Sequence, residues 1–156
     1  MTQPAVERFL ASIAPLGLSP EVREFDESTH TAAEAAAAIG CDVAAIVKSL
    51  LFEADGDPLL VLASGPNRVD TAALGERLGA TIGKADAAAV KRATGYSIGA
   101  VPPLGHVVPL RTVFDETLLD LPVVWAAAGS PTAVFAIAPA ELARLTSAEV
   151  LPITAG

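Results

Sequence analysis

The stretch Ala44-Ala45-Ile46-Val47-Lys48-Ser49-Leu50-Leu51-Phe52 decides the fold. It is a short apolar run rich in β-branched and large side chains, which is typical of a buried strand. A second apolar run covers residues 58–63, and Asp55-Gly56 lies between the two runs. This dipeptide favours a tight turn. The segment therefore predicts a β-hairpin with strands at residues 46–53 and 58–63.

Lys48 interrupts the first run with a charge. Strand side chains alternate with a period of two, so Ile46, Lys48, Leu50 and Phe52 are expected on one face. Burying an unpaired ammonium is costly, so this lysine must extend to solvent, find a partner or face a cavity. The chain has only three lysines. We therefore take Lys48 as a candidate site residue.

The rest of the chain alternates between predicted helices and strands. Helical periodicity, capping residues and terminal glycines or prolines predict helices at residues 4–16, 31–40, 69–78, 86–93 and 139–145. Short strands are predicted at residues 21–26, 81–84, 107–114, 123–128, 133–137 and 150–153. Strands in clusters with helices between them predict an α+β fold, formed by a single domain over residues 1–156.

The composition excludes several classes of protein. The 156 residues are 52% hydrophobic and contain one cysteine, Cys41, so no intrachain disulfide can form. The histidines, His30 and His106, form no metal-ligand spacing with it, and neither a metal nor a cofactor is expected. The N-terminus lacks a signal-peptide pattern, and no apolar stretch reaches the roughly 20 residues that span a bilayer. We expect a soluble, cytoplasmic protein.

The charge distribution leaves two interpretations open. The net charge of −8 argues against a nucleic-acid binder, because phosphate neutralisation needs Lys and Arg. Five of the ten basic residues nevertheless lie between Arg68 and Arg92. A solvated helical surface is the more general explanation for such a cluster. The alternative is a small phosphate-contacting patch that includes Lys84, Lys91 and Arg92.

The loop over residues 94–106 is the second candidate element. It is dense in glycine and proline and poor in charge, as is backbone that shapes a pocket. Tyr96 either lines this pocket or packs beneath the loop. His106 is either an acid–base group or, as is more common for a lone histidine beside prolines, a structural residue.

These segments together resemble the YbaK/prolyl-tRNA-synthetase editing-domain family of aminoacyl-tRNA deacylases. The similarity includes the Lys48 strand and the Gly-x-x-x-Pro loop from Gly99 to Pro103. It extends to the helix start at residues 30–34, the strand at 112–116 and Ala127-Ala128-Gly129. The resemblance implies a mixed central β-sheet with flanking helices around a small pocket.

The resemblance also implies a function. The substrate would be a tRNA mischarged with a small amino acid, tRNA-Pro or a related tRNA, and the reaction would be hydrolysis of its ester. Lys48 and Gly99 match the catalytic positions, and the substrate itself would help to activate the water. A synthetase is a candidate partner, whereas DNA and membranes are not. The expected substrate-binding residues are Ile46, Leu50, Tyr96, Ala100, Val101, Pro102, Pro103, His106, Gly129 and Ser130.

Two positions depart from family patterns. Ala44 stands where alanine-specific members carry asparagine, and Ser130-Pro131 replace the basic residues of cysteine-specific members. The amino acid that is removed therefore stays open. Two rival functions also stay open: a non-catalytic aminoacyl-tRNA binder or regulatory partner of a synthetase, and a hydrolase of another small ester.

Overall fold

The computed structural model describes residues 3–25, 31–106 and 108–154. Its helices are α1 (Pro4–Ile13), α2 (Ala32–Ile39), α3 (Thr71–Leu78), α4 (Ala87–Thr94) and α5 (Pro139–Thr146), and its 3-10 helices are η1 (Ala14–Leu16), η2 (Val43–Ala45) and η3 (Glu116–Asp120). Its strands are β1 (Val22–Glu24), β2 (Val47–Ala54), β3 (Asp57–Ser64), β4 (Ile82–Lys84), β5 (Arg111–Asp115), β6 (Val124–Ala127), β7 (Ala133–Ile137) and β8 (Glu149–Leu151).

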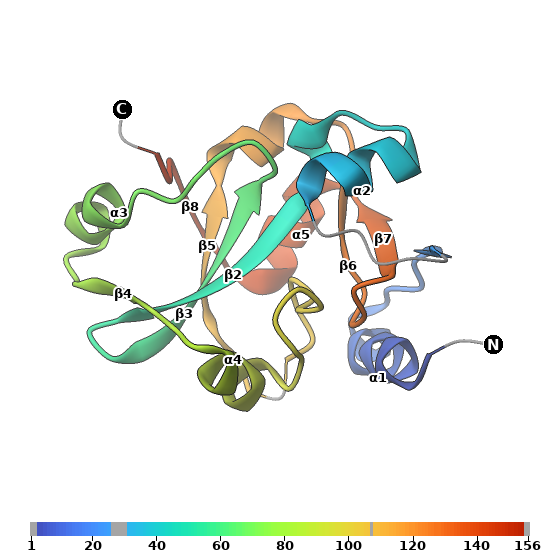
Figure 1. Ribbon diagram of the computed structural model, residues 1–156, viewed down its shortest axis with the longest axis horizontal. Helices are drawn as coiled ribbons and strands as arrows, with labels where there is room; N and C mark the ends of the chain where they lie inside the picture. Colours follow the sequence, from blue (N-terminus) through green and yellow to red (C-terminus); the bar gives the residue numbers. More distant parts are fainter. Residues whose placement is uncertain (1–2, 26–30, 107, 155–156) are drawn as a thin grey trace.

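The strands form two sheets (Figure 1). The larger sheet has the order β4-β2-β3-β5-β8 and is mixed, because β3 pairs with β5 and β5 with β8 in parallel while the other pairs are antiparallel. The smaller sheet is antiparallel, with the order β1-β7-β6. The α+β class with a mixed sheet is thus confirmed. The second sheet was not foreseen, because pairing partners far apart in the chain leave no local sequence signal.

The predicted hairpin is the centre of the larger sheet. Lys48 pairs with Ala63 and Phe52 with Leu59, and the turn at Asp55-Gly56 joins the strands. In β3, residues 59–63 are all fully buried. Both faces of this strand are covered, which explains its unbroken apolar run.

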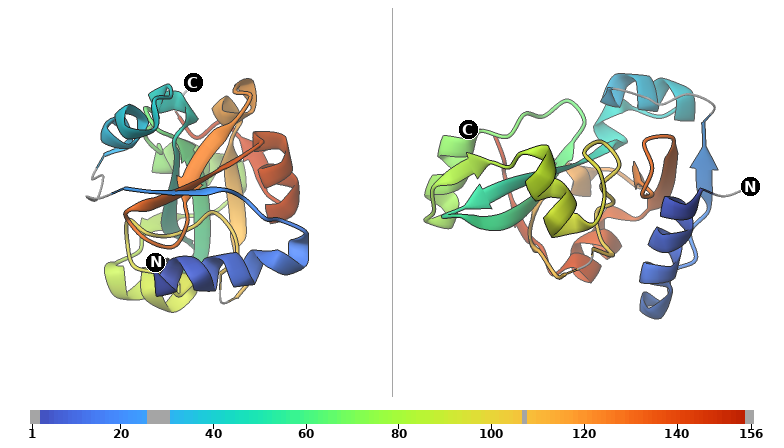
Figure 2. Two further views of the ribbon diagram at one scale, coloured as in Figure 1. Left: turned by 90° about the vertical axis from the view of Figure 1, so that its right-hand side faces the viewer. Right: turned by 60° about the horizontal axis from the view of Figure 1, so that its bottom comes forward.

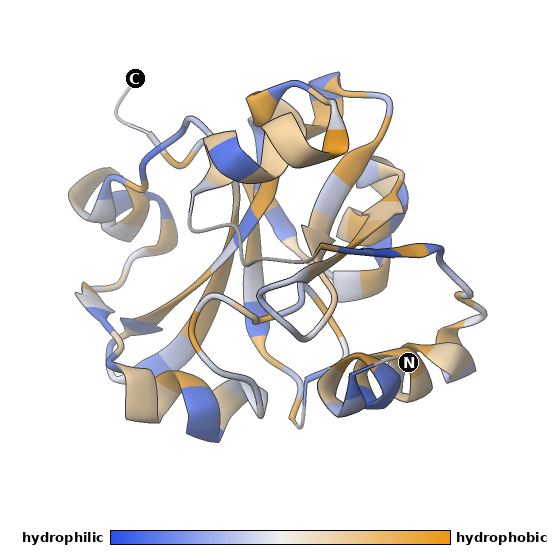
Figure 3. Ribbon diagram, turned by 45° about the vertical axis from the view of Figure 1, so that its right-hand side comes forward, coloured by the Kyte–Doolittle hydropathy of each residue, from blue (hydrophilic) through white to orange (hydrophobic). Residues whose placement is uncertain are grey.

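Two hydrophobic clusters cover the two faces of the larger sheet. Between the sheets, Phe9 of α1 packs against Phe135 of β7, with ring centroids 5.0 Å apart. On the outer face, Leu74 of α3 packs against Leu59 and Val61. Figure 2 shows α1 beside the smaller sheet, and Figure 3 shows that the strands are largely hydrophobic while hydrophilic segments gather on helices and loops. The larger sheet is therefore the central layer.

Several predicted boundaries change in the structure. The strand predicted at 107–114 is shorter and begins at Arg111, after Pro109, since proline cannot donate to a strand ladder. The edge strand predicted at 150–153 is Glu149–Leu151. Asp26, His30 and Val107 lie outside the described residues. No helix in the described part of the chain is long and apolar enough to cross a bilayer.

Candidate functional site

The candidate site lies where one edge of β2 separates from its neighbours. On this edge β4 pairs only with Phe52–Ala54, and Ile46 forms an isolated parallel bridge with Trp125 of β6. Between these two points no described strand pairs with this edge of β2, while its other edge pairs with β3. Figure 1 shows α2 at one end of this edge and α4 at the other. The arrangement leaves a slot between the two sheets.

A cavity of about 470 Å³ occupies this slot. This volume lies within the roughly 300–1,000 Å³ that is typical of small-molecule sites. Both faces of β2 contribute to its wall, because the slot follows the edge of the strand. The lining residues are Thr31, Ala32, Ala35, Ile46, Val47, Lys48, Ser49, Leu50, Leu51, Phe52, Lys84, Ala85, Val90, Ile98, Gly99, Val101, Trp125, Ala126, Ala127, Ser130, Pro131, Ala133 and Val134.

Lys48 provides a cation in this wall. Its Nζ atom donates a hydrogen bond of 2.6 Å to the main-chain carbonyl of Asn67, in the loop between β3 and α3. Burial lowers the pKa of Lys48 below its ordinary value of 10.5, and the positive charge of Arg68 lowers it further. The carboxylate of Asp115 acts in the opposite direction. The side chain is thus held against a polar loop while it lines a largely apolar cavity.

The loop around Gly99 forms the opposite wall. The amide of Ala100 donates to the carbonyl of Ser97 at 2.9 Å, which closes a turn, and Gly99 has a φ of +84°. L-residues rarely adopt this conformation. Within the described residues, the amides of Gly99 and Val101 donate to no protein acceptor. They are therefore candidate donors to a bound ligand.

The cavity contains few groups able to transfer protons. Its described lining residues include no carboxylate, imidazole or thiol. Ser49 contributes a buried hydroxyl that has no hydrogen-bond partner in the described structure, whereas Ser130 donates to the side-chain oxygen of Gln3 at 2.8 Å. No group of three or more metal-ligating side chains occurs among the described residues. The site can stabilise negative charge better than it can abstract a proton.

The structure brings together about half of the residues that the sequence indicated. Ile46, Leu50, Val101 and Ser130 line the cavity with Lys48 and Gly99. Five other expected pocket residues are buried and do not line this cavity: Tyr96, Ala100, Pro102, Pro103 and Gly129.

Tyr96 and Gly129 have structural roles that explain their residue types. The guanidinium of Arg8 lies 4.4 Å from the centre of the Tyr96 ring, so α1 packs over the loop. A Cβ atom on Gly129 would lie 2.7 Å from the carbonyl oxygen of Ala5. Close approach of α1 thus requires glycine at position 129.

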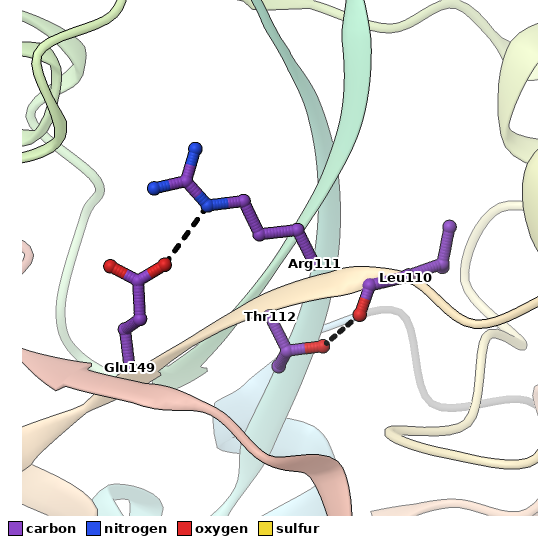
Figure 4. Close-up of polar contacts among 4 residues, drawn as sticks. All are labelled: Leu110, Arg111, Thr112 and Glu149. Carbon is purple, nitrogen blue, oxygen red and sulfur yellow. Dashed lines mark hydrogen bonds and ion pairs between the residues drawn. The ribbon is translucent and has the colours of Figure 1, made fainter.

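His106 ends the same loop but does not line the candidate cavity. Its Nε2 atom is 2.7 Å from the carbonyl oxygen of Pro102, and burial lowers the pKa of His106 while this hydrogen bond opposes the shift. It lines a second cavity of about 590 Å³, at whose edge Arg111 and Glu149 form an ion pair (Figure 4). His106 therefore braces the Gly99–Pro103 loop from behind.

The three basic candidates divide between two positions. Lys84, the last residue of β4, is exposed and lines the rim of the cavity. Lys91 and Arg92 are exposed on α4 outside the cavity, and Lys91 donates to the carbonyl of Gly95 at 3.3 Å. These cations lie on consecutive elements that border the site.

Trp125 is a wall residue, although its place in a strand pattern is typical of the core. It is only partly buried, it lines the cavity, and the guanidinium of Arg23 lies 5.6 Å from its ring. The alternation of side chains along β6 indicates its position, because Val124 and Ala126 point into the core and Trp125 must therefore point to the other face. Phe135, which occupies a similar strand pattern in β7, is by contrast fully buried.

Comparison with known proteins places this chain in a family. Residues 26–145 match the family described as the aminoacyl-tRNA editing domain. The uncharacterized protein YwhH of Bacillus subtilis is 30% identical over 131 residues, which cover 83% of each chain. A segment of 77 residues is 38% identical to proline–tRNA ligase of Lactobacillus helveticus and covers 49% of this chain but only 14% of that enzyme.

A solved structure supports the same assignment. The crystal structure of a proposed trans-editing enzyme for prolyl tRNA synthetase superimposes with a TM-score of 0.95, at 40% identity and with full coverage of both chains. Both the fold and the sequence are therefore shared over the whole length. The chain belongs to the aminoacyl-tRNA editing domain family, the YbaK/prolyl-tRNA-synthetase editing-domain family that the Lys48 strand and the Gly99 loop resemble.

Proposed function

We propose that this protein is a trans-editing hydrolase, which removes a small amino acid from a mischarged tRNA. The observation that carries the proposal is that Lys48 and the Gly99 loop line one largely apolar cavity in a member of an editing family. Residues 1–156 would act as one editing domain in the cytoplasm, without a metal or cofactor. Similarity to proline–tRNA ligases and to a proposed trans-editing enzyme for prolyl tRNA synthetase favours tRNA-Pro as the substrate.

Electrostatic stabilisation is the main catalytic effect that this geometry supports. In ester hydrolysis the oxygen of water bonds to the carbonyl carbon, and negative charge develops on the carbonyl oxygen. The ribose oxygen then leaves with a proton, so the products are a free amino acid and an uncharged tRNA end. A preorganised donor to the developing oxyanion contributes up to about 3–4 kcal/mol. The ammonium of Lys48 and the amides of Gly99 and Val101 are the proposed donors.

Activation of the water is assigned to the substrate. The described cavity wall has no carboxylate or imidazole to accept a proton, which supports a role for a hydroxyl of the terminal ribose. Lys48 could also contact the terminal phosphate in the same complex, since its ammonium is a point charge with three donors. Both roles require the charged form of the lysine.

The test is the deacylation of tRNA charged in turn with Ala, Ser, Cys, Thr and 2-aminobutyrate. We expect hydrolysis of at least one of them, and a fall in kcat of about 100-fold or more for Lys48→Ala.

The matched control is Arg111→Ala, which removes a cation that pairs with Glu149 outside the cavity. Equal kcat/KM for Lys48→Ala and the parent would refute the role of Lys48. Protection of the charged tRNA without turnover would show a binding protein, and hydrolysis of small esters without tRNA would show a different hydrolase.

A further inference from the structure

The partner of the Lys48 ammonium is a main-chain carbonyl. A carboxylate would attract the ammonium from a range of positions, whereas a carbonyl must be placed within hydrogen-bond distance. The carbonyl of Asn67 lies 2.6 Å from Nζ and belongs to the short loop between β3 and α3. The position of the ammonium therefore depends on how firmly this loop is held.

The loop is fastened on two sides. Toward η2, the hydroxyl of Ser64 donates to the carbonyl of Ala44 at 2.6 Å. Toward β5, one carboxylate oxygen of Asp115 accepts the amide of Ser64 at 3.0 Å and the side-chain amide of Asn67 at 2.9 Å. The Asn67 amide also donates to the hydroxyl of Thr117 at 3.1 Å. Asn67 thus binds Asp115 through its side chain and Lys48 through its main chain.

Asp115 is suited to this role by its burial. It is 1% exposed, and a buried carboxylate is costly unless hydrogen bonds satisfy it. Its second oxygen accepts the amide of Thr117 at 3.0 Å, so both oxygens are fixed by the protein. Its negative charge also favours the charged form of Lys48, against burial and the charge of Arg68.

We infer that Asn67 and Asp115 are positioning residues, which hold the Lys48 ammonium at the cavity wall through the carbonyl of Asn67. Their importance for the reaction rests on the proposed function of Lys48. The hydrogen-bonded path runs from the Asp115 carboxylate to the Asn67 amide and from the Asn67 carbonyl to the ammonium. Neither Asn67 nor Asp115 lines the cavity, so the inferred effect of both on turnover is indirect and acts through the position of Lys48.

The variant Asn67→Ala tests the inference, because it removes the amide tether and keeps the main-chain carbonyl. We expect kcat to fall between about tenfold and a hundredfold, as displacement of a catalytic group by about 1 Å produces, with little change in KM. Asp70→Ala is the matched control. It lies in the same connection and removes the cap that Asp70 provides to the amide of Ala73, so it lowers the Tm without touching Lys48.

A second readout does not require activity. The chain contains three lysines, Lys48, Lys84 and Lys91, so protein labelled with carbon-13 at the lysine ε-carbon gives one NMR signal for each of them. The signal that disappears in Lys48→Arg is the signal of Lys48. Relaxation measurements should show an ordered Lys48 side chain in the parent and in Asp70→Ala, and a mobile one in Asn67→Ala. The signals of Lys84 and Lys91 serve as internal references. If Asn67→Ala fails to fold, Thr117→Val removes one of the two acceptors of the Asn67 amide and is measured in the same way.

The outcomes separate this inference from the proposed function. Mobilisation of Lys48 together with loss of kcat, both absent in Asp70→Ala, supports the positioning role. An ordered Lys48 in both Asn67→Ala and Thr117→Val overturns it, whatever the rates. Mobilisation of Lys48 with an unchanged kcat supports the positioning role and contradicts the catalytic role of Lys48 in the proposed function.

Discussion

Gly99 is the residue whose backbone conformation matters most to the proposed site. A Cβ atom on Gly99 would meet nothing within 4 Å, so a small side chain there would clash with no neighbouring atom. Its φ of +84° would instead be strained, by about 1–2 kcal/mol, in any residue with a side chain. The loop would relax, and its amides would leave their positions.

We predict that Gly99→Ala lowers kcat for every substrate and lowers the Tm by a few degrees. Gly79→Ala is a matched control, because Gly79 has a φ of +66° and equally open surroundings, but it lies at the end of α3 away from the cavity. Measurements of kcat and Tm on both variants separate the effect of backbone strain on stability from the effect of the Gly99 amides on turnover. A similar loss of kcat in both would show that general strain, and not the position of the Gly99 amides, is responsible.

The lowered pKa of His106 predicts that the stability of the protein depends on pH. Burial lowers its pKa in the folded state below the value of about 6.5 that it has when unfolded. Between the folded pKa and about pH 6.5, the unfolded chain therefore binds more protons than the folded one. The contribution of His106 to the free energy of unfolding is complete above about pH 6.5 and is lost as the pH falls from that value toward the folded pKa. The protein should therefore be less stable at pH 5 than at pH 7.

His106→Gln should reduce this pH dependence, because the glutamine amide can still donate to the carbonyl of Pro102 but does not titrate. Tm values of the parent and the variant between pH 5 and pH 8 provide the check. A parallel pair of curves would show that other groups cause the loss of stability at low pH.

At the scale of elements, the edge of β2 connects fold and site. The strand is paired with β3 along its whole length, but β4 covers only its last three residues on the other edge. An open strand edge normally presents unpaired main-chain groups, which proteins cover or use for binding. Here α2, α4 and the Gly99 loop surround it, so the open edge becomes a cavity wall.

The basic residues of β4 and α4 are the proposed tRNA-binding groups at this scale. Replacing Lys84, Lys91 and Arg92 together with alanine should raise KM with little change in kcat, because these cations lie at the rim or outside the cavity. The slope of log KM against log salt should become shallower by about 0.7–0.9 for each tRNA phosphate that the variant no longer neutralises.

The control is the pair Arg111→Ala and Arg144→Ala, which removes positive charge from β5 and α5 instead. Steady-state kinetics at several salt concentrations compare the variants. If the triple variant retains the KM and salt slope of the parent, the cluster is a solvated surface, as the other interpretation of its charge requires.

At the scale of the whole molecule, selectivity depends on a cavity that several separate parts of the chain assemble. Its apolar walls include residues from α2, β2, α4, the Gly99 loop, β6 and β7, among them Leu50, Val101 and Trp125. Such walls exclude bulky groups by clash, but they distinguish one methylene by only about 1–3 kcal/mol. We predict hydrolysis of several small aminoacyl groups with modest preference among them, and none of leucyl or phenylalanyl groups. Single-turnover rates with each charged tRNA measure this, and efficient removal of phenylalanine would contradict it.

Local sequence patterns were sufficient for the elements that depend on neighbours in the chain. The β2–β3 hairpin follows from two apolar runs and Asp55-Gly56. Thr31 caps the start of α2, and its hydroxyl accepts the amide of Glu34 as the capping pattern predicts. Lys48 was also recognisable from the sequence alone as a candidate site residue, because a charge in an apolar strand is costly unless it has a partner or faces a cavity.

Tertiary structure alone decided which side chains reach the cavity. The residues of the 94–106 loop are similar in composition, yet Gly99 and Val101 line the cavity while Tyr96, Pro102 and Pro103 lie behind it. Asn67 and Asp115 are 48 residues apart and meet only because β3 and β5 pair in parallel. The sequence by itself determined the fold class, the hairpin and the choice of Lys48 as the candidate site lysine, since each depends on local periodicity or on an isolated charge. The partner of that lysine depends on contacts between distant segments, which local patterns do not encode.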